Sequence, residues 1–294
     1  MISEQRKVLI RTILTALAIG CVGFFAVAAI LQPFFSGRVV LPQNLHIGGL
    51  RIQFYGIILG LSALAGYWLA YKRRARFGIS SEQADAIILM LIICGFIGAR
   101  VYHVLSQLPF YLENPEQIVQ VWNGGLSIFG AALGGIIALW IYNSYFAKTK
   151  LQLLALLDWL IPSLALGHII GRFGNFMNYE LYGLPTNLPW KMYVPIQFRI
   201  PPFELNQFFH PVFLYEAAGG LVILVLFLKL KLKTGQLFLM WLFLYNVLRF
   251  FLEYMRVESI VYSGVRINAV VSLAAAAVAV YLWYRLWYRK ADNQ

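Results

Sequence analysis

Charged residues are scarce in this chain, and acidic residues are scarcer than basic ones. Only 12% of its 294 residues are charged, whereas 61% are hydrophobic. A soluble domain has about 25% charged residues, so the composition excludes an ordinary soluble protein and indicates a membrane protein. The net charge of +12 comes mostly from short Lys and Arg clusters between apolar runs, without interleaved aromatic residues. It therefore does not predict nucleic-acid binding.

Cysteine and histidine are also rare. Cys21 and Cys94 both fall inside apolar runs, so we expect both to be buried and no disulfide framework to form. The four histidines are scattered without the spacing of metal ligands. The sequence predicts no metal site and no other cofactor. It also has no internal repeat, which argues against a transporter built from inverted repeats.

Apolar runs of the length needed to cross a bilayer, roughly 20 residues, fill most of the chain. They lie at about 8–32, 52–71, 84–106, 124–146, 152–170, 211–230, 235–255 and 264–287. The first run is too long for a signal-peptide core and lacks a cleavage site, so we expect a retained helix. The prediction is an all-α integral membrane protein of about eight transmembrane helices. Residues 1–44 form an additional N-terminal helix with its connection, and residues 45–290 form the main bundle.

The Lys and Arg clusters set the expected orientation. They precede the first run and follow the second, fourth, sixth and eighth runs. The loop near 107–123 instead has no Lys or Arg, and its charged residues are Glu113 and Glu116. Because cytoplasmic loops carry the excess of Lys and Arg, both termini are expected in the cytoplasm. Residues 171–210, between the fifth and sixth helices, then lie outside. Their aromatic content predicts a folded cap on the membrane surface.

The most informative polar segment is Gly-Arg-Phe-Gly-Asn-Phe-Met-Asn-Tyr-Glu-Leu-Tyr-Gly at residues 171–183. It places Arg172, Asn175, Asn178 and Glu180 within nine positions beside an apolar run. Such residues are costly near a bilayer unless they face a bundle interior or cavity and bind something there. The alternative is an interfacial arginine that reaches lipid headgroups among polar neighbours.

A second group lies on one stripe of the seventh run. Tyr245, Arg249, Glu253 and Arg256 are spaced by four, four and three residues, so Arg249 and Glu253 can pair across one helical turn. An intramembrane arginine facing a cavity can grip a phosphodiester bidentately. The alternative is a structural ion pair that lets the helix tolerate charge.

Two further groups flank other runs. His210 precedes the sixth run and titrates near neutral pH, so it is either a general base or an ordinary interfacial histidine. The segment Asn123-Gly124-Gly125-Leu126-Ser127 opens the fourth run, where we expect free amides to meet an anion. Gly130 and Gly134 equally suit helix packing.

Tyr55 and Arg100 lie toward the outer ends of the second and third runs. Tyr55 suits ligand contact and an interfacial aromatic belt equally well. Arg100 needs a partner, and the available acidic residues are Glu180, Glu216 and Glu253. The excess of buried cations favours an anionic lipid headgroup as ligand.

Taken in order, these segments resemble the signature of bacterial phosphatidylglycerol–prolipoprotein diacylglyceryl transferases. The matching segments are Tyr55-Gly56, Gly98–Arg100, Gly124–Ser127, Gly171–Gly183, His210–Glu216 and Tyr245–Glu253. The resemblance implies a metal-independent enzyme of the bacterial inner membrane. It would transfer diacylglycerol from phosphatidylglycerol to the lipobox cysteine thiol of a prolipoprotein signal peptide, forming a thioether and releasing glycerol phosphate. Its partners would be these substrates and membrane lipids.

The resemblance also implies residue roles. Arg172 and Arg249 would hold the phosphate and stabilise charge on the leaving group. Glu253 would orient Arg249, and Tyr245 would line the pocket. The other residues expected to bind substrate are Tyr55, Arg100, Gly125, Ser127, Asn175, Asn178 and Glu216, with Glu180 shaping the headgroup site.

Two departures from the family pattern matter. Phe129 stands where many members carry a histidine proposed to activate the thiol. The proton then goes to His210 or Glu180, or the thiol ionises in the arginine-rich field. A non-catalytic lipid-binding homologue is therefore one alternative, and a lipid transporter or flippase is another. The second departure is the helix at 8–32, which is additional to the usual seven.

Overall fold

The structure is a computed structural model that describes residues 2–48, 50–121, 124–146, 153–230 and 232–287. Within these ranges, eight helices are long and apolar enough to cross a membrane. The prediction of an all-α integral membrane protein is therefore confirmed. Asn123 lies outside the described ranges, as do Lys148, Lys150, Lys231, Arg289 and Lys290, which belong to the Lys and Arg clusters after the fourth, sixth and eighth runs.

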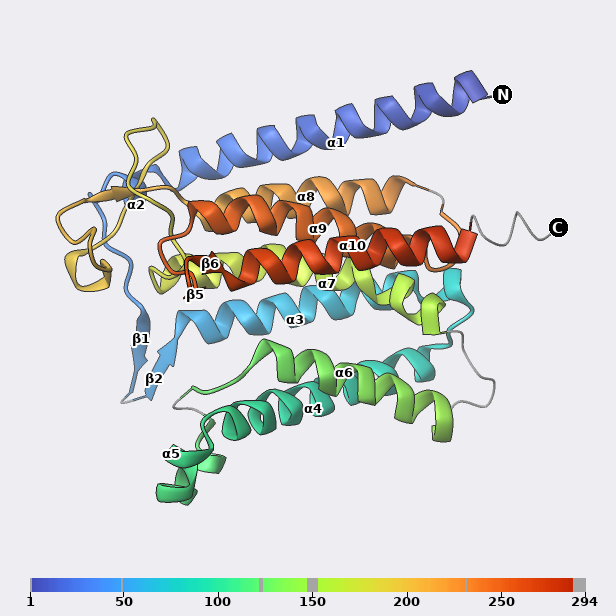
Figure 1. The fold of residues 1–294 in the computed structure, drawn as a ribbon, viewed down its shortest axis with the longest axis horizontal. Helices are drawn as coiled ribbons and strands as arrows, with labels where there is room; N and C mark the ends of the chain where they lie inside the picture. Colours follow the sequence, from blue (N-terminus) through green and yellow to red (C-terminus); the bar gives the residue numbers. More distant parts are fainter. Residues whose placement is uncertain (1, 49, 122–123, 147–152, 231, 288–294) are drawn as a thin grey trace. The chain divides into compact units, whose positions relative to one another are not determined.

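Helices dominate the element order (Figure 1). They are α1 (Ile2–Ile30), α2 (Gln32–Phe35), α3 (Phe54–Arg73), α4 (Ser81–Ser106), α5 (Leu108–Glu113), α6 (Ile128–Ile141), α7 (Leu153–Met177), α8 (Val212–Lys229), α9 (Gln236–Met255) and α10 (Ile267–Trp287). A π-helical turn at Tyr142–Phe146 extends α6, and 3-10 turns occupy Arg74–Phe77, Pro115–Val119 and Ile196–Phe198.

Three short antiparallel hairpins complete the described elements. They pair β1 (Asn44–Ile47) with β2 (Leu50–Gln53), β3 (Met192–Tyr193) with β4 (Phe208–Phe209), and β5 (Val261–Tyr262) with β6 (Val265–Arg266).

Three predicted helix boundaries are wrong by four residues or more. The first spanning helix begins at Ile2 rather than about 8, because its charged first turns continue the helix before the apolar run. The other two errors fall near functional segments. The fourth spanning helix begins at Ile128 rather than 124, because Gly124 and Gly125 have φ of 93° and 78° and cannot start a right-handed helix. The fifth continues to Met177 rather than ending at 170. Its polar residue Arg172 is tolerated there because an acidic partner on α8 compensates its charge.

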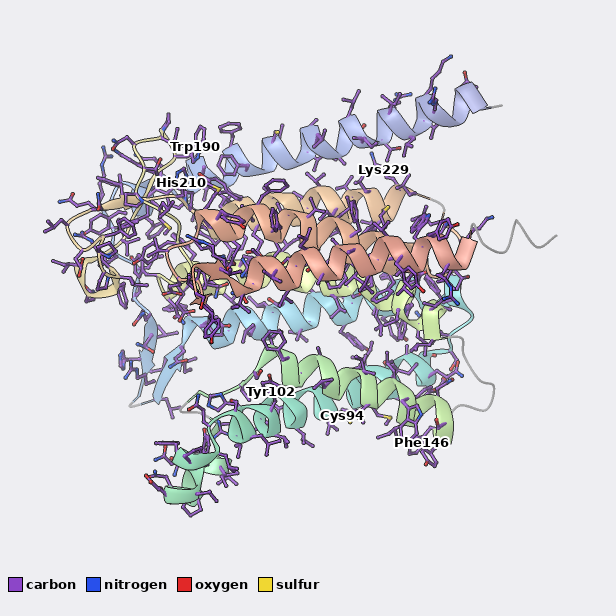
Figure 2. The ribbon with its side chains drawn as sticks, viewed as in Figure 1. Cys94, Tyr102, Phe146, Trp190, His210 and Lys229 are labelled. Carbon is purple, nitrogen blue, oxygen red and sulfur yellow. The ribbon has the colours of Figure 1, made fainter. Side chains whose placement is uncertain are left out.

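The chain divides into two compact units, Met1–Trp68 with Leu160–Gln294, and Leu69–Trp159. In the first unit α8 packs against both α1 and α9, and α9 packs against α10 (Figure 1). His210 and Trp190 lie beside one end of α8, and Lys229 lies at its other end (Figure 2).

The second unit is built on a close crossing of α4 and α6. A Cβ added to Gly98 would lie 2.4 Å from the Gly130 carbonyl oxygen, and one on Gly134 would lie 2.1 Å from the Cys94 carbonyl oxygen. Small residues allow helix backbones to approach this closely in membranes. Gly130 and Gly134 therefore serve helix packing, which was one of the two interpretations that their sequence left open.

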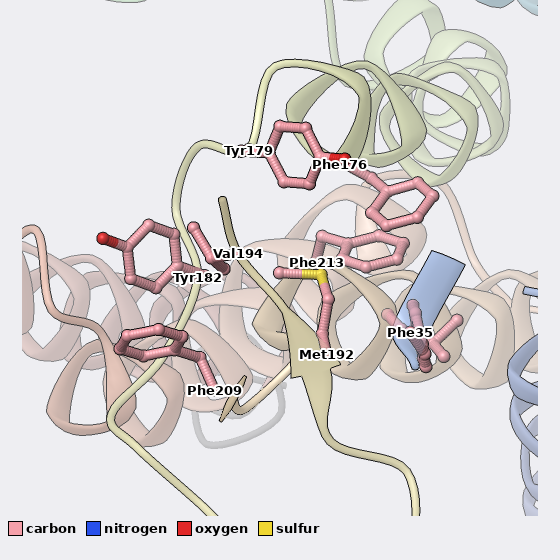
Figure 3. Packing of buried hydrophobic residues seen from close by; sticks show 9 residues of the cluster. Phe35, Phe176, Tyr179, Tyr182, Met192, Val194, Phe209 and Phe213 are labelled. Atoms are coloured by element: carbon pink, nitrogen blue, oxygen red, sulfur yellow. The ribbon is translucent and has the colours of Figure 1, made fainter. Parts of the chain in front are cut away.

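A hydrophobic cluster organises residues 178–211 at the ends of α7 and α8. Its buried members are Phe35, Phe176, Tyr179, Tyr182, Met192, Val194, Phe209, Phe213 and Leu214 (Figure 3). The cluster joins side chains of this segment to α2, α7 and α8. Of the predicted cap at 171–210, residues 171–177 belong to α7 and the remainder is folded. Its position outside the membrane stays a prediction.

The cysteines differ from expectation. Cys21 is exposed on the surface of α1, and Cys94 is half-buried on α4. Both are free thiols. The prediction that both are buried is wrong, because an apolar run in a membrane protein also supplies the face that lipid covers.

Candidate active site

Glu216 on α8 is the centre of a buried polar network in the first unit. Its side chain is 1% exposed, and Oε1 lies 2.8 Å from Arg172 Nη2 of α7. Oε2 lies 2.7 Å from Nη2 of Arg256, the residue that ends α9. Oε1 also accepts a hydrogen bond from the Tyr245 hydroxyl at 2.9 Å. Because a buried carboxylate needs compensating charge and hydrogen bonds, this one residue fixes side chains from two neighbouring helices.

Arg249 and Glu253 form the i, i+4 pair expected on α9. Arg249 Nη2 lies 2.8 Å from Glu253 Oε2, and the Glu253 side chain is fully buried. Glu253 Oε1 also accepts hydrogen bonds from Ser259 and Asn268, at 2.7 and 3.0 Å. A carboxylate held from three sides gives Arg249 a fixed orientation.

We call Arg172, Arg249, Arg256, Glu216 and Glu253 the arginine–glutamate cluster. Arg249 also lies within electrostatic range of Glu216, which links the two parts of the cluster. Within these five residues, three guanidinium groups face two carboxylates. Among the described residues, Arg249 Nη1 and Arg256 Nε are buried without a hydrogen-bond acceptor. Buried donors without a partner are costly, and an anion would satisfy them.

The two asparagines connect this cluster to Glu180. Arg172 Nη1 donates to Asn175 Oδ1 at 3.3 Å, and Asn175 Nδ2 donates to Glu180 Oε2 at 3.4 Å. Asn178 Nδ2 donates to Glu180 Oε1 at 2.9 Å. Residues 178–180 are not helical, so the predicted helical face through residue 180 is wrong beyond Met177. The four signature residues are nevertheless brought together, because the chain folds back after the helix.

Tyr55 lies against the same stretch of α7. A Cβ added to Gly174 would lie 2.9 Å from the Tyr55 ring, so only glycine permits this contact. Tyr55, on α3, therefore packs against Gly174, the residue that precedes Asn175 on α7.

His210 belongs to a different network. Its Nδ1 lies 2.9 Å from the Tyr215 hydroxyl, which also accepts a hydrogen bond from Trp190 Nε1 at 2.8 Å. Partial burial lowers the pKa of His210 below its ordinary value. The imidazole is therefore neutral at pH 7 and can accept a proton. The contacts described for it do not join it to the arginine–glutamate cluster.

Arg100, in the second unit, holds a loop together. Its guanidinium donates to the carbonyl oxygens of Ile118, Gly124 and Gly125, each at 2.8 Å, and to that of Gln117. The expectation of an acidic partner is wrong for Arg100, because backbone carbonyls satisfy its donors instead.

In the glycine-rich loop, two backbone amides are already hydrogen-bonded. The Gly124 amide donates to the Val121 carbonyl and the Ser127 amide to the Ala99 carbonyl, so neither is free to meet an anion. Phe129 is exposed and its ring contacts that of Tyr102. Gly125 has no room for a side chain, since a Cβ would lie 2.5 Å from Arg100 Nη1.

Sequence reasoning missed three residues of the first unit's network. Ser259 and Asn268, which donate to Glu253, follow α9 without a helical spacing that would indicate them. His168 Nε2 accepts a hydrogen bond from Arg172 Nε at 2.9 Å and lies 3.2 Å from the Tyr245 hydroxyl. His168 precedes Arg172 by four residues, and this spacing on a helix could have predicted that the two side chains meet. Arg256 was placed on the correct stripe, but its pairing with Glu216 depends on how α8 and α9 pack.

The profile of the prolipoprotein diacylglyceryl transferase family matches residues 42–285. This chain belongs to that family. The resemblance seen in the sequence is confirmed, and every residue of the arginine–glutamate cluster lies in the matched region.

Similar proteins named phosphatidylglycerol–prolipoprotein diacylglyceryl transferase occur in several bacteria. One from Fervidobacterium nodosum is 35% identical over 286 residues, covering 96% of each chain. One from Nostoc sp. is 37% identical over 259 residues, covering 85% of this chain and 90% of the relative. One from Bacillus licheniformis is 37% identical over 255 residues, covering 82% and 92%. With its eight spanning helices, this member of the transferase family is a multi-pass bacterial membrane protein.

Proposed function

We propose that this protein transfers the diacylglyceryl group of phosphatidylglycerol to the lipobox cysteine thiol of a prolipoprotein. The observation that carries the proposal is the arginine–glutamate cluster. It brings three guanidinium groups together and leaves two of their buried N–H donors without an acceptor, in a chain of the transferase family. A phosphodiester carries one negative charge and accepts such donors bidentately.

The reaction is a displacement at carbon. The cysteine sulfur forms a bond to the terminal CH₂ of the diacylglyceryl group, and the bond from that carbon to the phosphate oxygen breaks. The bonding electrons leave with the oxygen, so glycerol phosphate departs with a second negative charge. Arg172 and Arg249 stabilise that developing charge, and Glu253 holds Arg249 in place.

Further residues of the first unit shape the binding site. Asn175, Asn178 and Glu180 present amide and carboxylate groups to the hydroxyls of the glycerol headgroup. Tyr55 and Tyr245 line the site through their contacts with Gly174 and Glu216. In the second unit, Arg100 sets the path of the loop that carries Gly125 and leads to Ser127.

The thiol proton must leave the sulfur, and Phe129 cannot take it. Three routes follow from the residues present. His210 accepts the proton as a neutral imidazole, Glu180 accepts it as a carboxylate, or the arginine-rich field lowers the thiol pKa enough for ionisation without a base. We favour His210 slightly, because partial burial keeps its imidazole neutral at pH 7.

We place the protein in the bacterial inner membrane with both termini in the cytoplasm. The Lys and Arg clusters support this orientation. Residues 178–211 then form a cap on the outer surface, where a translocated prolipoprotein presents its cysteine.

The test uses purified protein in vesicles that contain phosphatidylglycerol, with a lipobox peptide as acceptor. We expect the peptide to gain the mass of a diacylglyceryl group and glycerol phosphate to appear in equal amount. A matched peptide with serine in place of cysteine should not react. Binding of lipid and peptide without products would instead favour a lipid-binding homologue, and movement of lipid between leaflets without products would favour a flippase.

A further inference from the structure

Residues 24–43, which we call the N-terminal strap, pack against the segment that carries the headgroup residues. The strap is the end of α1, α2 and the connection that follows, and the family profile begins only at residue 42. Phe24 contacts the rings of Trp190 and Tyr215, with centroids 5.8 and 5.7 Å apart. Phe35 contacts Phe176 and Phe213 in the buried cluster (Figure 3).

The strap also makes two polar contacts with the turn after α7. The Leu41 amide donates to the Tyr179 hydroxyl at 2.9 Å, and Gln43 Nε2 donates to the Asn178 carbonyl oxygen at 3.4 Å. Tyr179 is 4% exposed, so its hydroxyl is fixed by packing as well as by this bond.

The turn that receives these contacts is strained. Tyr179 and Leu181 both have φ of 55°, in the left-handed region that residues other than glycine rarely adopt. Glu180 lies between them and accepts hydrogen bonds from Asn175 and Asn178. Such a conformation persists only where the surroundings hold it, and the strap supplies part of that support.

We propose that the N-terminal strap is a positioning element for the headgroup site, with Tyr179 as its positioning residue. The Tyr179 hydroxyl, held by the Leu41 amide, keeps the turn in the conformation that aligns Asn178 and Glu180. The inference rests on the proposed function of that site. It gives the additional N-terminal helix a role in substrate binding beyond membrane anchoring.

The first test compares Tyr179→Phe with Tyr182→Phe in the full-length protein. Both variants lose a hydroxyl from the same buried cluster, but the Tyr182 hydroxyl bonds to Phe198 and Ile200 rather than to the strap. We expect Tyr179→Phe to raise the KM for phosphatidylglycerol about three- to tenfold, the worth of one hydrogen bond, with kcat nearly unchanged. Both variants should lower the melting temperature by a similar amount, because each loses one buried hydroxyl. Tyr182→Phe should leave the KM for phosphatidylglycerol unchanged.

A double variant tests whether Tyr179 acts through Asn178. If it does, Tyr179→Phe should add little to the KM increase already caused by Asn178→Ala. Additive effects of the two substitutions on KM would overturn the role of the strap. So would a normal KM in Tyr179→Phe, provided that wild type is active and Asn178→Ala is impaired. Either outcome would leave the proposed function intact.

Hydrogen exchange provides a readout that does not depend on turnover. Amides of residues 178–181 should exchange several-fold faster in Tyr179→Phe than in wild type or Tyr182→Phe. Unchanged exchange there would overturn the positioning role. An inactive wild type with accelerated exchange in Tyr179→Phe would instead refute the proposed function and retain the structural role of the strap.

Discussion

At the scale of single residues, the site depends on one buried carboxylate, that of Glu216, which forms ion pairs with two arginines. Glu216 forms ion pairs with both Arg172 and Arg256, so loss of its charge would leave both guanidinium groups without this carboxylate. Removing one partner of a buried ion pair is strongly destabilising, because the remaining charge stays desolvated. Variants that keep a residue's hydrogen bonds are therefore more informative here than variants that remove a charge from the centre.

His168 permits such a comparison. Its Nε2 is the acceptor for Arg172 Nε. His168→Gln keeps an acceptor oxygen and should retain most activity, whereas His168→Leu should lose roughly 10- to 100-fold in kcat/KM, because a buried donor is left unpaired. Steady-state rates of the two purified variants provide the measurement. Equal activity of His168→Leu and wild type would show that Arg172 does not need this support.

The proton acceptor is tested by a pH–rate profile. If His210 is the base, wild-type activity should fall as pH drops below 7 toward the lowered pKa of His210, because the protonated ring cannot accept a proton. His210→Gln should then be inactive at every pH, since glutamine hydrogen-bonds but does not titrate.

If the arginine field ionises the thiol instead, His210→Gln should stay active and its rate should rise with the titration of the thiol. Full activity of this variant at neutral pH would exclude His210 as an essential base.

Residue types and helical spacing predicted much of the site. The Arg249–Glu253 pair and the grouping of Arg172, Asn175, Asn178 and Glu180 followed from local sequence. The partners of Arg100 did not, because carbonyls of an irregular loop leave no pattern in side-chain chemistry.

At the scale of elements, the α4–α6 pair shows how glycine sets helix distance. The Cβ of Gly134→Ala would lie 2.1 Å from the Cys94 carbonyl oxygen, whereas the Cβ of Gly135→Ala would meet only Leu91 Cδ2 at 3.6 Å. We expect Gly134→Ala to destabilise the protein by about 1–3 kcal/mol through overpacking. Gly135→Ala should be neutral or slightly stabilising. Thermal unfolding in detergent compares the two, and equal melting temperatures would contradict the close crossing.

Helix positions were predictable because hydrocarbon-length runs are long and unambiguous. Helix ends were less predictable. Because Gly124 and Gly125 have positive φ, α6 begins only at Ile128. The C-terminal end of α7 can include Arg172, because Glu216 on α8 compensates its charge. The return of residues 178–180 onto Asn175 depends on the packing of the strap and cap, which no local periodicity encodes.

At the scale of the whole molecule, the proposed orientation follows from charge. In a background without Cys21 and Cys94, Glu113→Cys should react with a membrane-impermeant thiol reagent from outside, and Lys233→Cys only after the membrane is opened. Both side chains are exposed, so reactivity reports the side of the membrane. The opposite labelling pattern would reverse the topology and place residues 178–211 in the cytoplasm.

The central claim is that two arginines on different helices stabilise a departing phosphate. The most direct measurement is the rate of glycerol phosphate release by Arg172→Ala, Arg249→Ala and the matched control Arg285→Ala, whose side chain is exposed at the end of α10. Each site variant should lose about 10²–10³ in rate, as expected for one charge-stabilising donor. The comparison uses the folded fraction of each variant, in which Glu216 keeps Arg256 and Glu253 keeps Ser259 and Asn268 as partners. Arg285→Ala should match wild type. Near-normal release by folded Arg172→Ala or Arg249→Ala would contradict the claim.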